Sequence, residues 1–502
     1  MKKTSILLLF ILALFFSACK NGTGEKAKEQ TASAAKITDI PVTSKSKEAI
    51  TAFQEGLAFS DENNGNKARD AFTKAIHLDP TLAIAYMYRS NFSLSAKSAI
   101  DDLANAKKNL STASDWEKMY YEFQNTFVTN DWNKRLEIAK KIAATYPDAA
   151  RAQTDLGSTY QAANMVSEER AAFQKAIELD PDWIGGYNAL GNSYLFSEPK
   201  DFKKAEENAL KVVEHSPKSS GARIALGDCY RAEDDLEKAR VAYTKAVELN
   251  PDEPVAYSKK GHVNSFLGKY EEARNDYKEA IKHDVDNTGG NTFIALTYVY
   301  AGDPQRAIQI FTDDVTKADA SGASQSKIAN EKINYLFNCA LICFHTGDVS
   351  HLKEVVTMMQ GPSDQLAQDV GSQEEKLVQK ANLLYWRALT SAVQGKLGDA
   401  KAKAQEMKTT LAPINIPTKL QDYEMVLGYI SMKDKKYADA ISHFEKANPN
   451  SVYTKYWQAM ANEAAGNKDK ATELFKQVST YNFNGVDYAV VRNEVKKKLA
   501  KS

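Results

Sequence analysis

Hydrophobic and polar positions recur along this chain with helical spacing. In the stretch LGDCYRAEDDLEKARVAYTKAVELNP, the large residues Leu226, Tyr230 and Tyr243 belong to apolar runs that repeat every three or four positions. This spacing places the apolar residues on one face of a helix. The stretch therefore predicts two amphipathic helices, and Pro251 ends the second because proline cannot continue an interior helix.

The same outline returns with a period of 34 residues, with two extra residues in one copy. A small residue in the first helix and alanines in the second allow the two helices to approach closely. A pair this short cannot bury its apolar face alone, so stacked pairs must share one continuous core. About twelve copies lie between residues 49 and 485. The small residues that mark the clearest first helices are Gly157, Gly191, Gly227 and Gly261.

The regularity of the repeat predicts how the chain is divided. A regular array covers 49–315 and a looser array covers 333–485, with a polar insertion at 316–332 between them. A second polar, Gly/Ser-bearing segment covers 360–376. We expect both polar segments to be surface loops, or hinges between the two arrays. The last residues, 486–502, predict one amphipathic helix that caps the array.

The repeat resembles the tetratricopeptide repeat, which has small residues at its eighth, twentieth and twenty-seventh positions and proline at its thirty-second. Tyr187 and Tyr257 stand where the family often has tryptophan. The resemblance implies an all-α, right-handed α-solenoid of helix-turn-helix pairs, with first helices lining a concave groove and second helices forming the convex back. The segment from Trp116 to Val315 also resembles, more weakly, the sensory repeat regions of bacterial signalling proteins.

The family geometry also implies which side chains face the groove. Asn188 and Asn192 lie one helical turn apart, a spacing suited to holding the backbone of an extended peptide. The alternative is that such residues are solvated helix faces. The groove lacks the Lys-then-Asn pattern of the family's carboxylate clamp, so we do not expect capture of a C-terminal carboxylate. The expected groove residues are Asn91, Tyr120, Gln124, Phe127, Arg151, Asn188, Asn192, Asp228, Arg231 and His262.

The N-terminus has a different pattern. Lys2 and Lys3 precede an apolar run, SILLLFILALFF, that is too short to span a bilayer comfortably. Small residues then lead to Cys19, and the segment resembles the lipobox of bacterial lipoproteins. The resemblance implies that residues 1–18 are a signal peptide and that Cys19 is lipidated. An uncleaved anchor and a plain secretory signal are the alternatives.

The polar residues 19–48 are expected to form a flexible linker between the lipid and the array. Lys20 stands where an aspartate would retain enteric lipoproteins at the inner membrane. By this resemblance, the protein is expected at the bacterial cell envelope, on an outer membrane, facing the periplasm or the cell surface.

Composition and motifs narrow the function. Lys+Arg and Asp+Glu both number 65, so the balanced charge argues against a general grip on nucleic acid. The sequence holds no nucleotide-binding, metalloprotease or nucleophile motif, so we expect no enzymatic activity, no cofactor and no metal. Cys229, Cys339 and Cys343 are expected to be buried as small hydrophobic residues.

These observations favour a lipid-anchored, non-enzymatic scaffold or adaptor that binds a protein or peptide in its groove. A sensory or regulatory module of a membrane complex is one alternative. A SusD-like, nutrient-binding outer-membrane lipoprotein is another, although the repeats of this chain are more contiguous than in that class.

Overall fold

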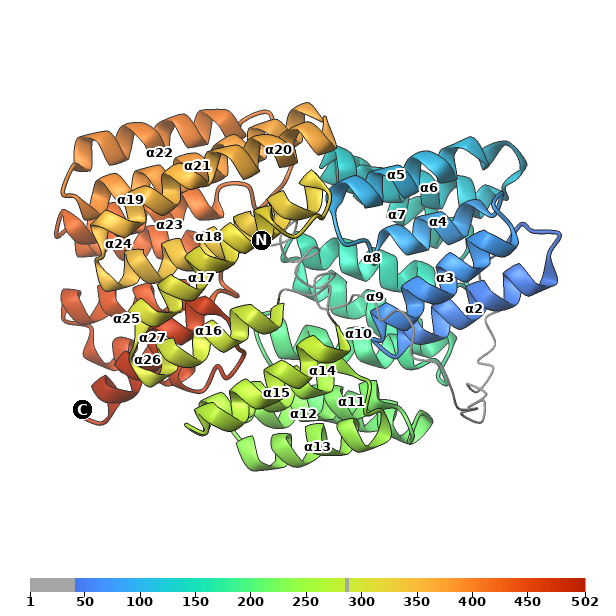
Figure 1. Ribbon diagram of the computed structural model, residues 1–502, viewed down its shortest axis with the longest axis horizontal. Helices are drawn as coiled ribbons and strands as arrows, with labels where there is room; N and C mark the ends of the chain where they lie inside the picture. The colour runs from blue at the N-terminus through green and yellow to red at the C-terminus, as the bar shows by residue number, and fades with distance from the viewer. Residues whose placement is uncertain (1–40, 285–288, 502) are drawn as a thin grey trace.

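The computed structural model describes residues 41–284 and 289–501, and within them all regular elements are helices (Figure 1). Consecutive helices pack as antiparallel pairs, which confirms the predicted right-handed α-solenoid. The pairs of the first half are α2 (Lys47–Asp61) with α3 (Gly65–Leu78), α4 (Ala83–Ser90) with α5 (Ala96–Lys108), α6 (Asp115–Thr129) with α7 (Trp132–Thr145), α8 (Ala150–Ala162) with α9 (Val166–Leu179), α10 (Ile184–Phe196) with α11 (Phe202–His215), and α12 (Ser220–Ala232) with α13 (Leu236–Leu249).

The second half continues the same arrangement. A short helix η1 (Leu110–Thr112), the extra helix α20 (Gln360–Val370) and the last helix α27 (Val486–Leu499) stand outside the pairs. The second-half pairs are α14 (Pro254–Phe266) with α15 (Tyr270–His283), α16 (Gly289–Ala301) with α17 (Pro304–Asp319), α18 (Gln325–Thr346) with α19 (Val349–Met358), α21 (Gln373–Val393) with α22 (Leu397–Leu411), α23 (Gln421–Lys433) with α24 (Tyr437–Lys446), and α25 (Val452–Ala465) with α26 (Lys468–Ser479). In the described part of the chain, each helix is too short or too polar to cross a membrane.

A contact between a glycine of the first helix and an aromatic ring of the second holds many pairs together. A β-carbon built on Gly227 would lie 2.5 Å from the ring of Tyr243, and one on Gly261 would lie 2.6 Å from the ring of Tyr277. Carbon atoms normally approach only to about 3.5–4.0 Å. The ring therefore lies against the helix backbone at a point where only glycine leaves room. The same overlap relates Gly56 to Phe72, Gly157 to Phe173, and Gly428 to Phe444.

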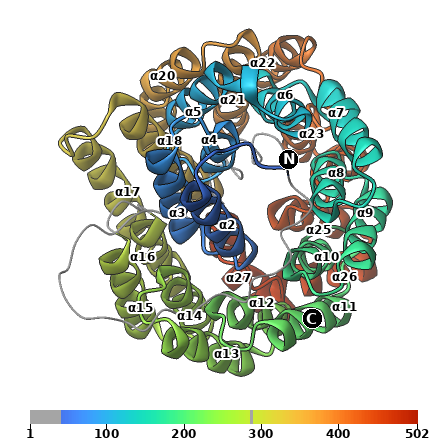
Figure 2. The ribbon, with the colours of Figure 1, turned by 90° about the vertical axis from the view of Figure 1, so that its right-hand side faces the viewer.

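The pairs wind into a ring when the molecule is viewed end-on, with α2 on the inner side of the ring (Figure 2). The C-terminal half also touches the N-terminal half: α20 contacts α5, and α21 contacts α6. Lys455 forms an ion pair with Glu198, and Asn450 donates from Nδ2 to Oδ1 of Asn164 at 3.2 Å. The solenoid is therefore closed on itself by contacts between distant repeats.

The structure corrects the prediction that the two polar segments are loops. Residues 316–319 finish α17 and residues 325–332 begin α18, which leaves only 320–324 outside a helix. The second segment, 360–376, consists largely of α20 and the start of α21. Ser324 and Ser372 cap the helices that follow them. The polar side chains here mark solvent exposure on helices and do not mark an interruption of the helical pattern.

The end of the predicted linker is also more ordered than we expected. Residues 42–46 lie against the array: the backbone amide of Thr43 donates to Glu117, and Ser44 Oγ hydrogen bonds to Asp79 Oδ2 at 2.5 Å. Ser46 then caps α2, which begins two residues before the predicted start of the array. The Thr43 amide and serine hydroxyls therefore tie this segment to the first repeats. Cys19 and the signal peptide lie outside the described residues.

The last helix matches the predicted capping helix and also bridges several repeats. It contacts α16, α18, α25 and α26. Tyr488, Val491 and Val495 are completely buried. Arg492 donates from Nη2 to the backbone carbonyl of Phe266, 2.9 Å away at the end of α14. The cap is thus part of the contact that closes the solenoid.

Gly227→Ala is expected to lower the free energy of unfolding by about 1–3 kcal/mol, because the added carbon must displace the ring of Tyr243. Gly398→Ala is the matched control, since a β-carbon on this helical glycine of α22 meets no atom within 4 Å. The control is expected to leave stability unchanged or raise it by up to about 1 kcal/mol. Urea unfolding followed by circular dichroism measures both, and equal destabilisation by the two variants would contradict the packing argument.

Candidate functional site

The ten predicted groove residues fall into three groups in the structure. Five of them line one cavity, two pack inside the wall formed by α6 and α7, and three lie in a buried polar cluster of α12 and α14. The cavity group is Asn91, Tyr120, Arg151, Asn188 and Asn192. The wall group is Gln124 and Phe127, and the buried cluster is Asp228, Arg231 and His262.

The cavity has a volume of about 330 Å³ and lies between the end of α2 and the first helices of the next repeats. We call it the α2–α10 cavity. Hydroxyl and amide groups dominate its wall, which makes it suited to hydrogen bonding. It is lined by Ser60, Asp61, Asn63, Tyr88, Asn91, Tyr120, Arg151, Thr154, Asp155, Ser158, Gln161, Phe173, Trp183, Gly185, Asn188, Ala189 and Asn192.

Asp61, the last residue of α2, forms one side of the cavity. Its carboxylate accepts two hydrogen bonds from the Arg151 guanidinium, at 2.9 and 2.5 Å, and one from the Trp183 indole at 2.8 Å. The Asn188 side chain donates to the Asp61 backbone carbonyl at 2.9 Å. The Arg151 guanidinium also lies 4.7 Å from the centre of the Trp183 ring. Such bidentate arginine–carboxylate pairs fix orientation as well as distance.

The turn after α2 continues across the inner side of the ring. The backbone carbonyl of Glu62 lies so close to Gly221 that a β-carbon there would overlap it. Asn64 donates from Nδ2 to Glu253 Oε2 at 3.0 Å. Residues 61–64 therefore contact α8, α10, α12 and the N-cap of α14 in succession, on the side of the array that the sequence assigned to a partner.

Tyr120 belongs to a stacked aromatic group. Its ring centre lies 5.0 Å from that of Tyr88, at an interplanar angle of 19°. Gln124 donates from Nε2 to its hydroxyl at 2.9 Å. Burial, with the negative charge of Asp155 as the next cause, raises the pKa of Tyr120 well above its usual range. The phenol is therefore neutral and able both to donate and to accept a hydrogen bond.

Phe127 and Gln124 are held by neighbours in the wall. The guanidinium of Arg135, from α7, lies 3.7 Å from the centre of the Phe127 ring. Arg135 also donates a hydrogen bond to Thr126. Gln124 is buried and bonded to Tyr120. These two predicted groove residues thus support the wall of the cavity and do not line it.

Asp228, Arg231 and His262 form the buried cluster. The Asp228 carboxylate accepts from Arg231 at 2.6 Å and from the Tyr243 hydroxyl at 2.6 Å. Burial would raise the pKa of Asp228, but the charges of Lys259 and Arg231 outweigh burial and hold it below the usual value. Burial, reinforced by the same two cations, lowers the pKa of His262 well below its usual value.

A short segment of the chain itself covers this cluster. The ring of Phe483 lies 4.6 Å from the Arg231 guanidinium, and Asn484 Nδ2 lies 3.0 Å from His262 Nδ1. Asn482 donates to Asp234 at 2.5 Å and is itself fully buried. The middle of the groove is therefore occupied by residues 482–484, and binding of an external partner by Asp228, Arg231 and His262 stays a prediction.

The main lining residues that sequence reasoning missed are Asp61, Trp183, Tyr88 and Asp155. Asp61 and Trp183 lie at helix ends, outside the first-helix positions that the repeat assigns to the groove. Their roles depend on the inner turn. Its hydrogen bonds join Asp61 to Arg151, which is 90 positions away in the sequence, and to Asn188, which is 127 positions away. A periodic pattern carries no signal for such a contact.

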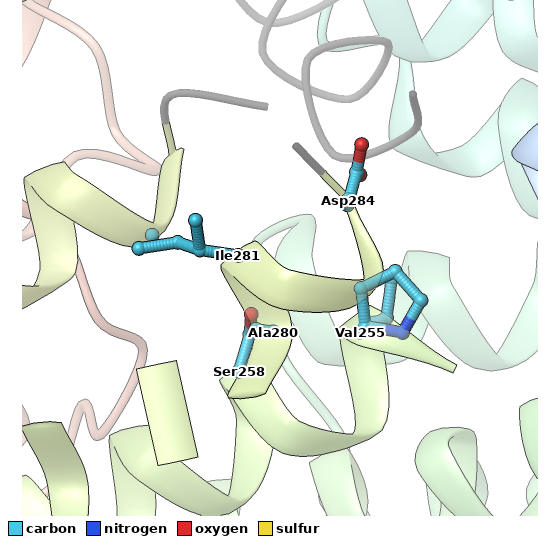
Figure 3. Close-up of a pocket in the computed structure, with 7 residues that line it drawn as sticks. Val255, Ser258, Ala280, Ile281 and Asp284 are labelled. Carbon is cyan, nitrogen blue, oxygen red and sulfur yellow. The ribbon is translucent and has the colours of Figure 1, made fainter. Parts of the chain in front are cut away.

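Other candidate sites are weak. A second cavity, lined by Val255, Ser258, Ala280, Ile281 and Asp284 among others, has a volume of about 10 Å³ (Figure 3). This volume is about that of one water. Among residues 41–284 and 289–501, no group of three or more potential metal ligands converges. Cys229, Cys339 and Cys343 are free and buried, as predicted.

Comparison with known proteins identifies the repeat. The profile of a family described as "Tetratricopeptide repeat" matches residues 150–182, 221–253 and 254–284. The chain therefore contains tetratricopeptide repeats, and the matches cover the pairs α8–α9, α12–α13 and α14–α15.

Relatives share only part of their length with this chain. "Tetratricopeptide repeat protein 6" of Homo sapiens is 26% identical over 146 residues, 29% of this chain and 28% of that protein. "Protein O-mannosyl-transferase TMTC3" of Mus musculus is 26% identical over 216 residues, 39% of this chain and 21% of that protein. The chain thus spans about a quarter of the length of these curated relatives.

Among solved structures, the chain is similar to TTC0263, described as "a thermophilic TPR protein" of Thermus thermophilus. The identity is 17% and the TM-score is 0.32, over 35% of this chain and 95% of that one.

The inner turn makes stability depend on pH through Glu253. Burial raises the pKa of Glu253 from 4.5 to about 7, so the folded protein holds this proton more tightly than the unfolded chain. The stabilisation that comes from protonated Glu253 is full below about pH 4.5. It is lost as the pH rises through 7. Glu253→Gln, which resembles the protonated acid, is expected to lose less stability between about pH 5 and pH 8 than the unmodified chain.

Thermal unfolding of both proteins at these two pH values measures the effect. Glu248→Gln, at a half-exposed glutamate of α13, is the matched control and should parallel the unmodified chain. The same difference in Tm between Glu253→Gln and the unmodified chain at both pH values would contradict the assignment.

Proposed function

We propose that this protein is a lipid-anchored scaffold of the cell envelope that binds a peptide segment of a partner protein in the α2–α10 cavity. The observation that carries the proposal is the cavity itself, which gathers side chains from α2, α4, α6, α8 and α10 in one place. Five of the residues expected to face the groove lie on its wall. Tetratricopeptide repeats typically bind other proteins, so peptide binding suits the fold.

The chemistry of the wall also suits a polypeptide backbone. Asn188 already donates its side-chain amide to a backbone carbonyl, that of Asp61. Asn192 lies one turn further along α10 and also lines the cavity. Paired amides of this kind hold the carbonyl and amide groups of an extended segment. Arg151 is oriented by Asp61 and Trp183, so contacts within the chain already set the position of this side chain.

Ser158→Trp is expected to abolish partner binding. Ser158 is exposed on α8 and lines the cavity, so an indole there fills space without disturbing the core. Gln174→Trp, at an exposed position of α9, is the matched control. A pull-down from membranes with the full chain measures the effect: a defined protein should be captured by the unmodified chain and by the control, and not by Ser158→Trp.

A second candidate is uptake of a compact polar nutrient such as a glycan, which the size of the cavity favours. About 330 Å³ lies at the lower end of the range of small-molecule pockets, roughly 300–1,000 Å³. The same variants separate the two functions. Binding of a glycan that Ser158→Trp abolishes, with no protein partner captured by any variant, would overturn the proposal of a peptide-binding scaffold.

The membrane anchor is a separate part of the proposal and rests on the sequence around Cys19. Cys19→Ala is expected to leave the membrane fraction and to stop incorporating labelled palmitate. Cys229→Ala, which removes a buried cysteine of α12, is the control and should remain lipidated. Retention of Cys19→Ala in the membrane would show that another element holds the protein there.

A further inference from the structure

The connection between the last two helices lies in the middle of the groove. α26 ends at Ser479 and α27 begins at Val486, so residues 480–485 form no helix. Side chains of this connection contact first helices or turns of four successive pairs, from α10–α11 to α16–α17. Solenoids bind their partners along such a row of consecutive repeats. Residues 481–484 therefore lie where a bound peptide segment is expected.

Two asparagine side chains of this segment are recognised by side chains of the groove. Asn484 Oδ1 accepts from the Tyr300 hydroxyl at 2.7 Å, and its Nδ2 donates to the Tyr277 hydroxyl at 3.1 Å. Asn482 Nδ2 donates to Asp234 Oδ1 at 2.5 Å. A donor and an acceptor placed together recognise both ends of an amide group. The groove is thus complementary to amide side chains at two positions, separated by one residue.

The ring of Phe483 lies between these two amides in the sequence and fills a site made by a cation and another ring. Its centre is 4.6 Å from the Arg231 guanidinium and 4.9 Å from the centre of the Phe196 ring. Phe196 is the last residue of α10 and is 37% exposed. Because the face of an aromatic ring attracts a cation, this site suits an aromatic residue better than an aliphatic one.

The internal segment satisfies Arg231 only in part. The side chain of Arg231 is fully buried, and its Nη2 donates to Asp228 at 2.6 Å. Within residues 41–284 and 289–501, Nε and Nη1 of Arg231 have no hydrogen-bond partner. Buried polar groups of folded proteins are nearly always hydrogen-bonded. The groove thus keeps two donors that a partner segment with a suitable acceptor can use.

We propose that this groove is a second binding surface, for a partner segment that carries an aromatic residue between two amide side chains, and that residues 481–484 keep it closed as an internal ligand. The surface is separate from the α2–α10 cavity, so the inference goes beyond the proposed function and does not depend on it. Because the internal segment is tethered beside the groove, a partner binds only the fraction of molecules in which that segment has moved out.

A blocked peptide with the sequence of residues 479–486, STYNFNGV, tests the inference. Phe483→Ala removes the ring that holds the internal segment against Arg231. This variant is expected to bind the peptide at least about tenfold more tightly than the unmodified chain does, measured by isothermal titration of the full chain in detergent. Peptides with alanine in place of the phenylalanine, or in place of both asparagines, should lose this binding.

Phe337→Ala is the matched control. Phe337 is a partly buried phenylalanine of α18 that packs on Trp386, so the same side chain is lost outside the groove. The control should bind the peptide no better than the unmodified chain. Equal binding by Phe483→Ala and the unmodified chain, or the same gain in the control, would overturn the inference. If circular dichroism shows that Phe483→Ala does not fold, Asn484→Ala, at a partly exposed residue, takes its place.

A peptide with benzoylphenylalanine in place of its phenylalanine locates the site by photocrosslinking. In Phe483→Ala the crosslink is expected on α12, near Arg231. Adding Ser158→Trp, which fills the α2–α10 cavity, should leave the affinity for the peptide unchanged. A crosslink on α8, or loss of binding when Ser158→Trp is added, would place the peptide in the α2–α10 cavity, in which case the inference fails and the proposed function stands.

Discussion

The close contact between a helix backbone and an aromatic ring is the constraint on which this solenoid depends. Wherever a first-helix glycine faces Tyr243, Tyr277 or another ring of the second helix, the two helices are brought to the same short separation. Repetition of one separation lets successive pairs stack with a shared core. The α10–α11 pair departs from this rule, because Gly191 meets Asn208 there and no ring. In the middle pairs the apolar core is divided into small clusters, including pairs that keep the glycine–ring contact.

Two segments of the chain reinforce these middle pairs from the inner side. The turn at residues 61–64 contacts α8, α10, α12 and the start of α14, and residues 482–484 cover the polar cluster around Arg231. Polar contacts thus hold the middle pairs together where the apolar clusters are small. The same contacts decide the shape of the available surface, because they fill the middle of the groove and leave a bounded cavity beside α2.

Helical periodicity, polarity and family geometry each predicted a different part of the structure. Helical periodicity and the small residues predicted the pairs, their close packing and the last helix. Polarity was a poor guide to helix ends: the segments around Ala320 and Gly361 are mostly helical, since exposed helices tolerate polar side chains on most of their faces. Half of the ten residues that family geometry assigned to the groove line the cavity, but that geometry could not separate Asn188, at the cavity, from His262, beneath residues 482–484.

The sequence alone therefore determined the repeat and the fold class, because these depend on neighbours within one pair of helices. The tertiary structure alone decided which inward-facing residues remain available to bind a partner. That decision rests on contacts such as Asp61 with Arg151 and Asn482 with Asp234, which join positions 90 and 248 residues apart. Such contacts form only when the solenoid has closed on itself, so no local period in the sequence encodes them.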